Sequence, residues 1–229
     1  MRTKMPHHKP ISKPHWGASQ KAEVMQMQGT ELDVMHIGAG KRYNAIIQTL
    51  SSPIPLDASI LDVGCGAVCT GKLFNSSNTT YLDPLLDDFK RTFPGELPDG
   101  EFINGMIENI DKSDNSYDLI LCLNTLSFVL NPELALHEIR RLLKHDATFV
   151  ISLALWPEML ARLHYIKTRI FSVGETQNRL YCYSYQGIKN TLKRHFKILK
   201  EIELDTRAPA FAHEKMFICQ HKDAPKHDK

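Results

Sequence analysis

Three kinds of feature are missing or scarce in this sequence, and each absence excludes a class of protein. No apolar run approaches the roughly 20 residues of a membrane-spanning helix, and the chain starts without an apolar signal core. The 5 cysteines are odd in number and match no CxxC pattern, so no metal site is predicted. A net charge of +2 makes a nucleic-acid partner unfavoured. These absences together predict a cytoplasmic protein without a membrane span.

The composition is that of a globular chain with its own core. Hydrophobic residues make up 42% of the 229 residues and charged residues 24%. This balance and this length fit one domain of ordinary size. The sequence therefore predicts a single folded unit, without fixing its oligomeric state.

Strand and helix patterns alternate through most of the chain. Short apolar runs predict strands at 60–63, 79–82, 101–104, 117–123, 147–153, 198–204 and 215–220. Between them, helices are predicted at about 70–74 and 85–93, after the capping pair Asn131-Pro132, and near 188–196. This alternation predicts an α/β fold with a doubly wound, seven-stranded, mostly parallel sheet between two helical layers, whose ligands bind beyond the carboxyl ends of the strands.

A glycine turn follows the first predicted strand. Gly64-Cys65-Gly66 comes directly after the strand and before the first helix, within LDVGCGAVCTG at 61–71. Such a turn lets backbone amides approach a ligand closely, and the helix that follows favours negative charge. A nicotinamide fingerprint would need a third glycine where Cys69 stands. A purely structural tight turn is the alternative interpretation.

A second acidic position ends the next strand. Asp83 stands 17 residues after Gly66 and precedes Pro84. Nucleotide-binding folds place an acid at about this distance, where it accepts hydrogen bonds from ribose hydroxyls. The alternative is an aspartate that only caps the helix after Pro84.

Three stretches resemble the motifs of class I S-adenosylmethionine (SAM)-dependent methyltransferases. Residues 61–71 resemble motif I, residues 105–120 resemble the signature that follows the third strand, and residues 123–132 resemble motif IV. The resemblance is strongest to the group that contains quinone-biosynthesis and small-molecule methyltransferases. It implies the Rossmann-like methyltransferase fold and SAM as the cofactor.

The resemblance also implies which residues contact the cofactor. Asp62 would orient the amino group of SAM, and the glycine loop would hold its methionine end. Met106 stands where many members have an acid for the adenine, and Phe128 stands where a histidine is frequent. The full set of implied cofactor residues is Asp62, Gly64, Cys65, Gly66, Asp83, Pro84, Met106, Ile107, Glu108, Leu123, Asn124 and Phe128.

These residues predict a methyltransferase that acts on a small or medium organic acceptor. Transfer from the SAM sulfonium needs an aligned acceptor, and a general base only if the acceptor must lose a proton. No catalytic residue is therefore assigned. Met106 and Phe128 leave open a non-catalytic protein that binds SAM or a partner in this fold. The basic N-terminal stretch leaves open an RNA-modifying enzyme.

The resemblance divides the chain into segments. We expect an N-terminal tail and helical cap at 1–58, a SAM-binding methyltransferase domain at 59–220 and a polar tail at 221–229. Within the domain, residues 156–185 break the regular alternation and are expected to cap the site. The run at 181–185, YCYSY, either lines an acceptor pocket or packs one buried face, and Lys144–Ala147 is expected to form a turn.

Overall fold

The computed structural model describes residues 10–28, 32–50, 53–170, 179–204 and 212–222. Its helices are α1 (Lys13–Gln28), α2 (Leu32–Thr49), η1 (Thr70–Phe74), α3 (Leu86–Thr92), η2 (Ile107–Asn109), α4 (Pro132–Leu142), α5 (Glu158–Ile170) and α6 (Tyr185–His195). Its strands are β1 (Ile60–Val63), β2 (Thr79–Asp83), β3 (Glu101–Asn104), β4 (Tyr117–Leu123), β5 (Leu143–Leu155), β6 (Phe196–Leu204) and β7 (His213–His221). Here η marks a short 3-10 helix.

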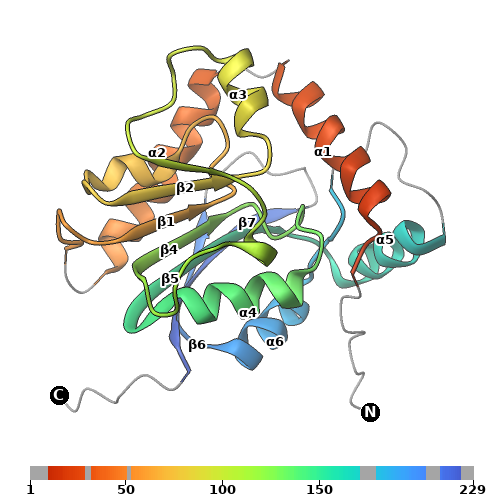
Figure 1. The fold of residues 1–229 in the computed structure, drawn as a ribbon. Helices are drawn as coiled ribbons and strands as arrows, with labels where there is room; N and C mark the ends of the chain where they lie inside the picture. The colour runs from red at the N-terminus through yellow and green to blue at the C-terminus, as the bar shows by residue number, and fades with distance from the viewer. Residues whose placement is uncertain (1–9, 29–31, 51–52, 171–178, 205–211, 223–229) are drawn as a thin grey trace.

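All seven strands form one sheet in the order β3-β2-β1-β4-β5-β7-β6 (Figure 1). Strands β1 to β5 are parallel to one another, while β7 is antiparallel to both β5 and β6. The predicted seven-stranded, mostly parallel sheet is confirmed. Because Val63 pairs with Leu82, β1 and β2 reach their carboxyl ends side by side.

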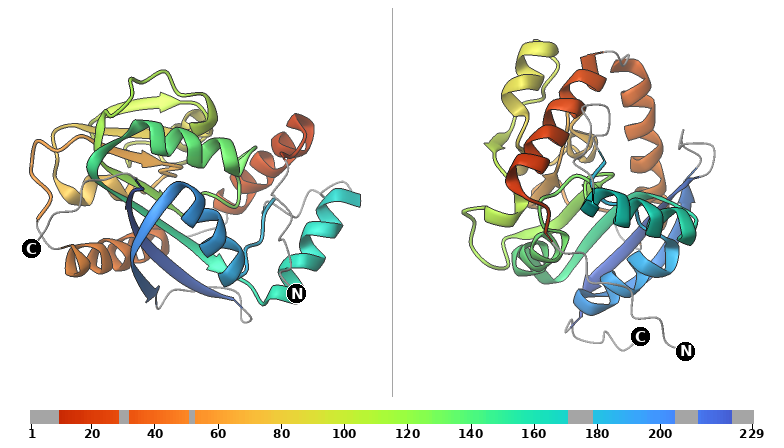
Figure 2. Two further views of the ribbon diagram at one scale, coloured as in Figure 1. Left: turned by 90° about the horizontal axis from the view of Figure 1, so that it is seen from below. Right: turned by 90° about the vertical axis from the view of Figure 1, so that its right-hand side faces the viewer.

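Helices cover both faces of the sheet, as Figure 2 shows. One face packs on α4 and α6, and the largest apolar cluster lies between them and the strands. A second cluster joins α2 and η1 to the opposite face. The sequence of α4 explains its side: Leu136, Ile139 and Leu142 recur at helical spacing and are fully buried. The result is the expected three-layer arrangement.

Two helices, α1 and α5, lie outside the two layers that cover the sheet. Figure 2 shows α1 and α5 beyond the edge of the helix–sheet–helix sandwich. The segment just before α1 is attached near this edge, because the Ile11 amide donates a hydrogen bond of 3.1 Å to the carbonyl of Leu130. Within the described ranges no helix is both long and apolar enough to cross a membrane.

Two predicted boundaries are wrong. The turn expected at Lys144–Ala147 belongs to β5, which starts at Leu143 directly after α4. Leu143 pairs with Tyr117, and the Lys144 ammonium lies 2.8 Å from the Asp118 carboxylate, so strand pairing continues across a register shift. Phe196, expected on the last helix, begins β6, where its ring packs 4.7 Å from that of Phe149.

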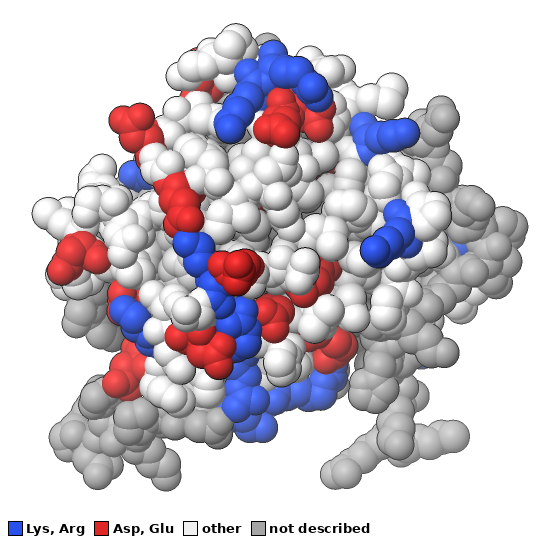
Figure 3. Space-filling view, in the orientation of Figure 1, with Lys and Arg blue, Asp and Glu red and all other residues white. Residues whose placement is uncertain are grey.

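Charges of both signs are mixed on the face drawn in Figure 3. Ion pairs account for part of this pattern, including Lys112 with Glu101 at 2.6 Å and Arg141 with Asp114 at 2.7 Å. Exposed pairs of this kind contribute little stability each, because water screens them. On this face, the described residues form no broad area of one sign.

Candidate functional site

A cavity of about 380 Å³ opens at the carboxyl ends of β1, β2 and β4. Side chains from α1 and α2 close its outer side, among them Trp16, Gln20 and Met35. Every residue that the sequence analysis assigned to the cofactor lies in its wall. These are Asp62, Gly64, Cys65, Gly66, Asp83, Pro84, Met106, Ile107, Glu108, Leu123, Asn124 and Phe128.

The glycine loop has left-handed backbone, which favours glycine. Gly64 has a φ of +63°, and a Cβ atom there would lie 2.2 Å from the Cγ2 atom of Thr125. Gly66 also has a positive φ, +59°. Left-handed backbone of this kind is strained for residues with side chains. The amides of Gly64 and Gly66 donate to the Leu82 carbonyl and the Asp83 carboxylate, so the bend is fixed to the end of β2.

Asp62 is buried beneath this loop. Its carboxylate accepts a hydrogen bond of 2.7 Å from the amide of Gly71, at the start of η1. Burial raises the pKa of Asp62 to about 7, although the Gly71 hydrogen bond opposes the shift and the nearby Asp83 adds to it. A carboxylate so short of donors favours a ligand that brings a positive charge or an N–H group.

Asp83 ties β2 to the glycine loop. One of its oxygens accepts from the Gly66 amide at 3.1 Å and the other from the Leu85 amide at 2.9 Å. Burial raises its pKa to about 6, while these two amides hold the value down and Glu23 raises it further. Each oxygen keeps a free lone pair for a second donor, such as a ribose hydroxyl. The capping role and the ligand role of Asp83 are thus compatible.

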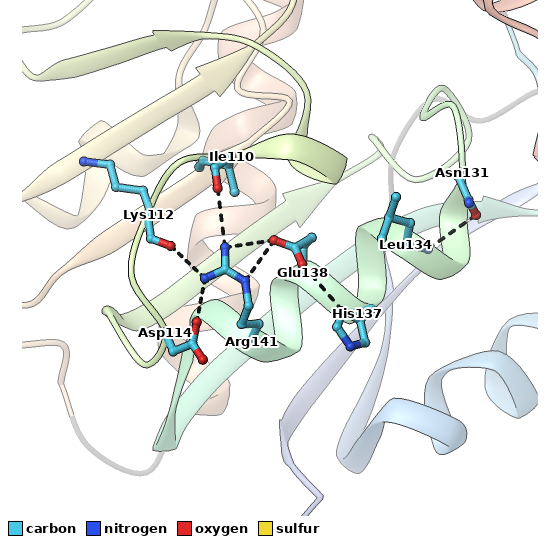
Figure 4. A network of polar contacts seen from close by, with 8 residues as sticks. All are labelled: Ile110, Lys112, Asp114, Asn131, Leu134, His137, Glu138 and Arg141. Carbon is cyan, nitrogen blue, oxygen red and sulfur yellow. Dashed lines mark hydrogen bonds and ion pairs between the residues drawn. The ribbon is translucent and has the colours of Figure 1, made fainter.

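The loop after β3 forms the next part of the wall. Met106 has extended backbone before η2, and Glu108 accepts a hydrogen bond of 2.9 Å from the amide of Asn131. The Glu108 carboxylate therefore already holds the segment that leads into α4. Figure 4 shows that Arg141 of α4 holds the following loop as well, through the carbonyls of Ile110 and Lys112 and the carboxylate of Asp114.

Phe128, after β4, forms the wall beyond the glycine loop. Its carbonyl accepts hydrogen bonds from the Trp16 indole at 3.1 Å and from the Gln20 amide at 3.4 Å, which attach α1 to this wall. The guanidinium carbon of Arg179 lies 5.3 Å from the centre of the Phe128 ring. The same guanidinium donates to the hydroxyl of Ser127 at 3.3 Å.

A buried ion pair, which the sequence analysis missed, closes another part of the cavity. Arg42 of α2 donates two hydrogen bonds to the carboxylate of Glu214 in β7, at 2.7 and 2.9 Å. Ser152 and Asn124 donate to the same carboxylate at 2.8 and 3.1 Å. A pattern in a short stretch of sequence cannot predict a contact between positions 172 residues apart. The predicted strand even began at Lys215, one residue too late to include Glu214.

The tyrosine run at 181–185 packs in the core. The hydroxyl of Tyr181 donates to the carbonyl of Leu130 at 2.9 Å, and that of Tyr183 donates to the carbonyl of Leu126 at 3.4 Å. Both rings are buried in the cluster under α4 and α6. Among the described residues of 156–185, only Arg179 lines the cavity. Whether 156–185 caps the site remains a prediction.

Comparisons with known proteins bear on this domain. Residues 61–151 match the family described as "Methyltransferase domain". The protein MJ0638 of Methanocaldococcus jannaschii is 38% identical over 95 residues, which cover 42% of this chain and 40% of that protein. The aligned part therefore spans less than half of this relative.

Two solved structures share the fold over nearly the whole chain. One is the 1,6-didemethyltoxoflavin-N1-methyltransferase of Burkholderia thailandensis with bound 1,6-didemethyltoxoflavin and S-adenosylhomocysteine (SAH). It has 19% identity, coverage of 94% of this chain and 93% of that one, and a TM-score of 0.64. The other is a SAM-dependent methyltransferase of Thermotoga maritima, with 14% identity, coverage of 91% and 100%, and a TM-score of 0.61. At these identities the likeness shows a common fold.

Proposed function

We propose that the protein is a SAM-dependent methyltransferase that modifies a small or medium organic acceptor; the match of residues 61–151 to the methyltransferase-domain family and the seven-stranded sheet support this proposal. One observation carries the proposal. Asp62 and Asp83 end neighbouring strands and face a single cavity, with a left-handed glycine bend between them.

The residues in the wall suit the chemical groups of SAM. Asp62 is a buried carboxylate with one backbone donor, so it can accept from the ammonium of the methionine part. Asp83 has lone pairs for two ribose hydroxyls. Met106 and Ile107 offer apolar surface and backbone to the adenine, and Glu108, held through one oxygen by the Asn131 amide, keeps its other oxygen for a donor.

The chain itself has a limited task in the reaction. Bound SAM supplies an activated methyl group on a sulfonium, with a good leaving group attached. The protein has to hold the acceptor in line with that group, which alone can remove several kcal/mol of the barrier. A general base is needed only if the acceptor has to lose a proton, so we assign none.

The acceptor is proposed to enter at the Phe128 end of the cavity. Trp16 and Gln20 donate hydrogen bonds to the Phe128 carbonyl and Arg179 lies over the Phe128 ring, so these four wall residues form what we call the Phe128 end. A volume of about 380 Å³ is at the lower end for ligand pockets, and the whole cofactor has to fit in it beside the acceptor. This restricts the part of the acceptor that enters to a small group.

Calorimetry and product analysis test this function. Titration with SAM is expected to show binding, and incubation with SAM and the low-mass fraction of a cell extract is expected to release SAH. Absence of binding by folded protein at millimolar SAM would end the proposal. SAH release only with the RNA fraction would favour an RNA-modifying enzyme, and binding with no turnover in either fraction would favour a non-catalytic role.

A further inference from the structure

The cavity wall contains two arginines in different electrostatic situations. Arg42 is neutralised by the two-point ion pair with Glu214, whose side chain is only 4% exposed. Arg179 also lines the cavity but forms no ion pair with any carboxylate of the described residues. Arg179 therefore brings a positive charge to the cavity that no carboxylate of the described residues neutralises.

The surroundings of Arg179 hold its guanidinium in place. The Phe128 ring supports it from one side at 5.3 Å, and the Ser127 hydroxyl accepts one of its N–H groups at 3.3 Å. The pKa of His164 is lowered, first by burial and then by the charge of Arg179. A guanidinium has five N–H donors, so most of its donors remain for a ligand.

Arg179 contacts a different part of the cavity wall from the one that contains Asp62 and Asp83. Its contacts are with Ser127 and Phe128, whereas Asp62 and Asp83 contact the glycine loop and the start of α3. Trp16 is attached to the same Phe128 by a hydrogen bond of 3.1 Å. One cation and two aromatic side chains thus meet at one end of the site.

We propose that the acceptor carries an anionic group, a carboxylate or a phosphate, which Arg179 binds while Phe128 and Trp16 pack against its apolar body. This assignment rests on the proposed function and adds to it the chemical class of the acceptor. A planar guanidinium matches carboxylate and phosphate oxygens in two-point geometry. The positive charge of the SAM sulfonium also attracts an anionic acceptor, which has to come close to it.

SAM has a carboxylate of its own, and this gives the proposal a clear rival. If Arg179 held the cofactor carboxylate, its loss would weaken SAM binding and leave the choice of acceptor unchanged. If it holds the acceptor, its loss leaves SAM binding nearly unchanged. Cofactor affinity and ligand charge preference therefore have to be measured on the same variants.

The experiment begins with calorimetry of SAM and SAH, which tests the proposed function independently. The SAH-saturated protein is then titrated with matched probes: aromatic and aliphatic carboxylates, each beside its neutral amide, and phosphate monoesters, each beside its alcohol. The variants are Arg179→Met and Arg179→Lys. The matched control is Arg162→Met, which removes an exposed arginine paired with Glu158 outside the cavity wall.

The wild type is expected to bind at least one class of anion about tenfold or more tightly than its neutral partner, as a charge-assisted pair should. Arg179→Met is expected to remove this preference with SAM affinity within about twofold, Arg179→Lys to keep part of it, and Arg162→Met to keep all of it. The proposal is overturned if no anion in the panel is preferred. It is equally overturned if Arg179→Met weakens SAM tenfold and the charge preference persists.

Discussion

The two ends of the cavity are built in opposite ways. At the cofactor end, the decisive contacts join residues close in sequence: Asp62 with Gly71, 9 residues apart, and Asp83 with Gly66, 17 apart. In the rest of the cavity wall, Trp16 meets Phe128 across 112 residues and Arg42 meets Glu214 across 172. The cofactor end is thus encoded in one short stretch, and the rest of the wall depends on the whole fold.

The two ends also differ in how charge is handled. The cofactor end buries two carboxylates whose donors are backbone amides, and the pKa of each is raised, to about 7 for Asp62 and about 6 for Asp83. The Arg42–Glu214 pair, in contrast, buries a carboxylate together with an arginine counter-ion. Buried carboxylates without a counter-ion favour a positively charged ligand, whereas a neutralised ion pair mainly holds the two elements that carry it together. The following changes are designed to break or sharpen this contrast.

Gly64→Ala should have the largest effect. The new Cβ atom would meet Thr125 at 2.2 Å on backbone with a φ of +63°. Overlap and strain together should destabilise the fold by roughly 2–5 kcal/mol, seen as a lower midpoint of urea unfolding, and should weaken SAM binding. Gly95→Ala is the control, because its φ of +83° is also positive but nothing lies within 4 Å. Equal losses in both variants would refute the steric role of Thr125.

Arg42→Met should act on stability more than on the cofactor. It leaves the Glu214 carboxylate buried without its arginine counter-ion, while the hydrogen bonds from Ser152 and Asn124 remain. Breaking a buried pair from one side costs about 3 kcal/mol or more, measurable by urea unfolding. The double variant Arg42→Met/Glu214→Gln should recover part of this loss. A double variant less stable than the single one would show that the pair is not the cause.

Asp83→Asn should act on the cofactor more than on stability. The asparagine carbonyl can still accept from one backbone amide, but the charge that strengthens the ribose hydrogen bonds is lost. We expect SAM affinity to fall by roughly 1–3 kcal/mol, about 5- to 150-fold, in calorimetry. Asp88→Asn on the exposed side of α3 removes the same charge outside the cavity wall and should leave affinity unchanged. Equal SAM affinities of the two variants would show that the Asp83 charge does not contribute to cofactor binding.

The raised pKa values predict a smaller effect of pH. Both aspartates have folded pKa values above 3.8, so their protonated forms stabilise the free protein at low pH, and this contribution fades as pH rises through 6 and 7. SAM favours the ionised forms through its positive charge and its donors. Its affinity should therefore rise at least about tenfold from pH 5 to pH 7, with proton release in calorimetry. Asp62→Asn should flatten this profile; an affinity independent of pH would contradict it.

The fold and the cofactor end could be predicted from sequence because their signals are local. The alternating apolar runs and the bend at Gly64 depend on neighbours within one strand–turn–helix unit. The rest of the cavity wall could not be predicted, because Arg42, Arg179 and Glu214 lie in elements whose contacts exist only after the sheet has formed. The turn expected near Lys144 was wrong for the same reason, since Leu143 pairs with Tyr117 of a strand that is distant in sequence.

A crystal structure of the SAH complex tests the central claim most directly. The account predicts the ribose hydroxyls within hydrogen-bonding distance of Asp83, the amino group on the side of Asp62, and the sulfur directed toward Phe128. A cofactor bound elsewhere, or bound in this cavity with neither aspartate in contact, would contradict it.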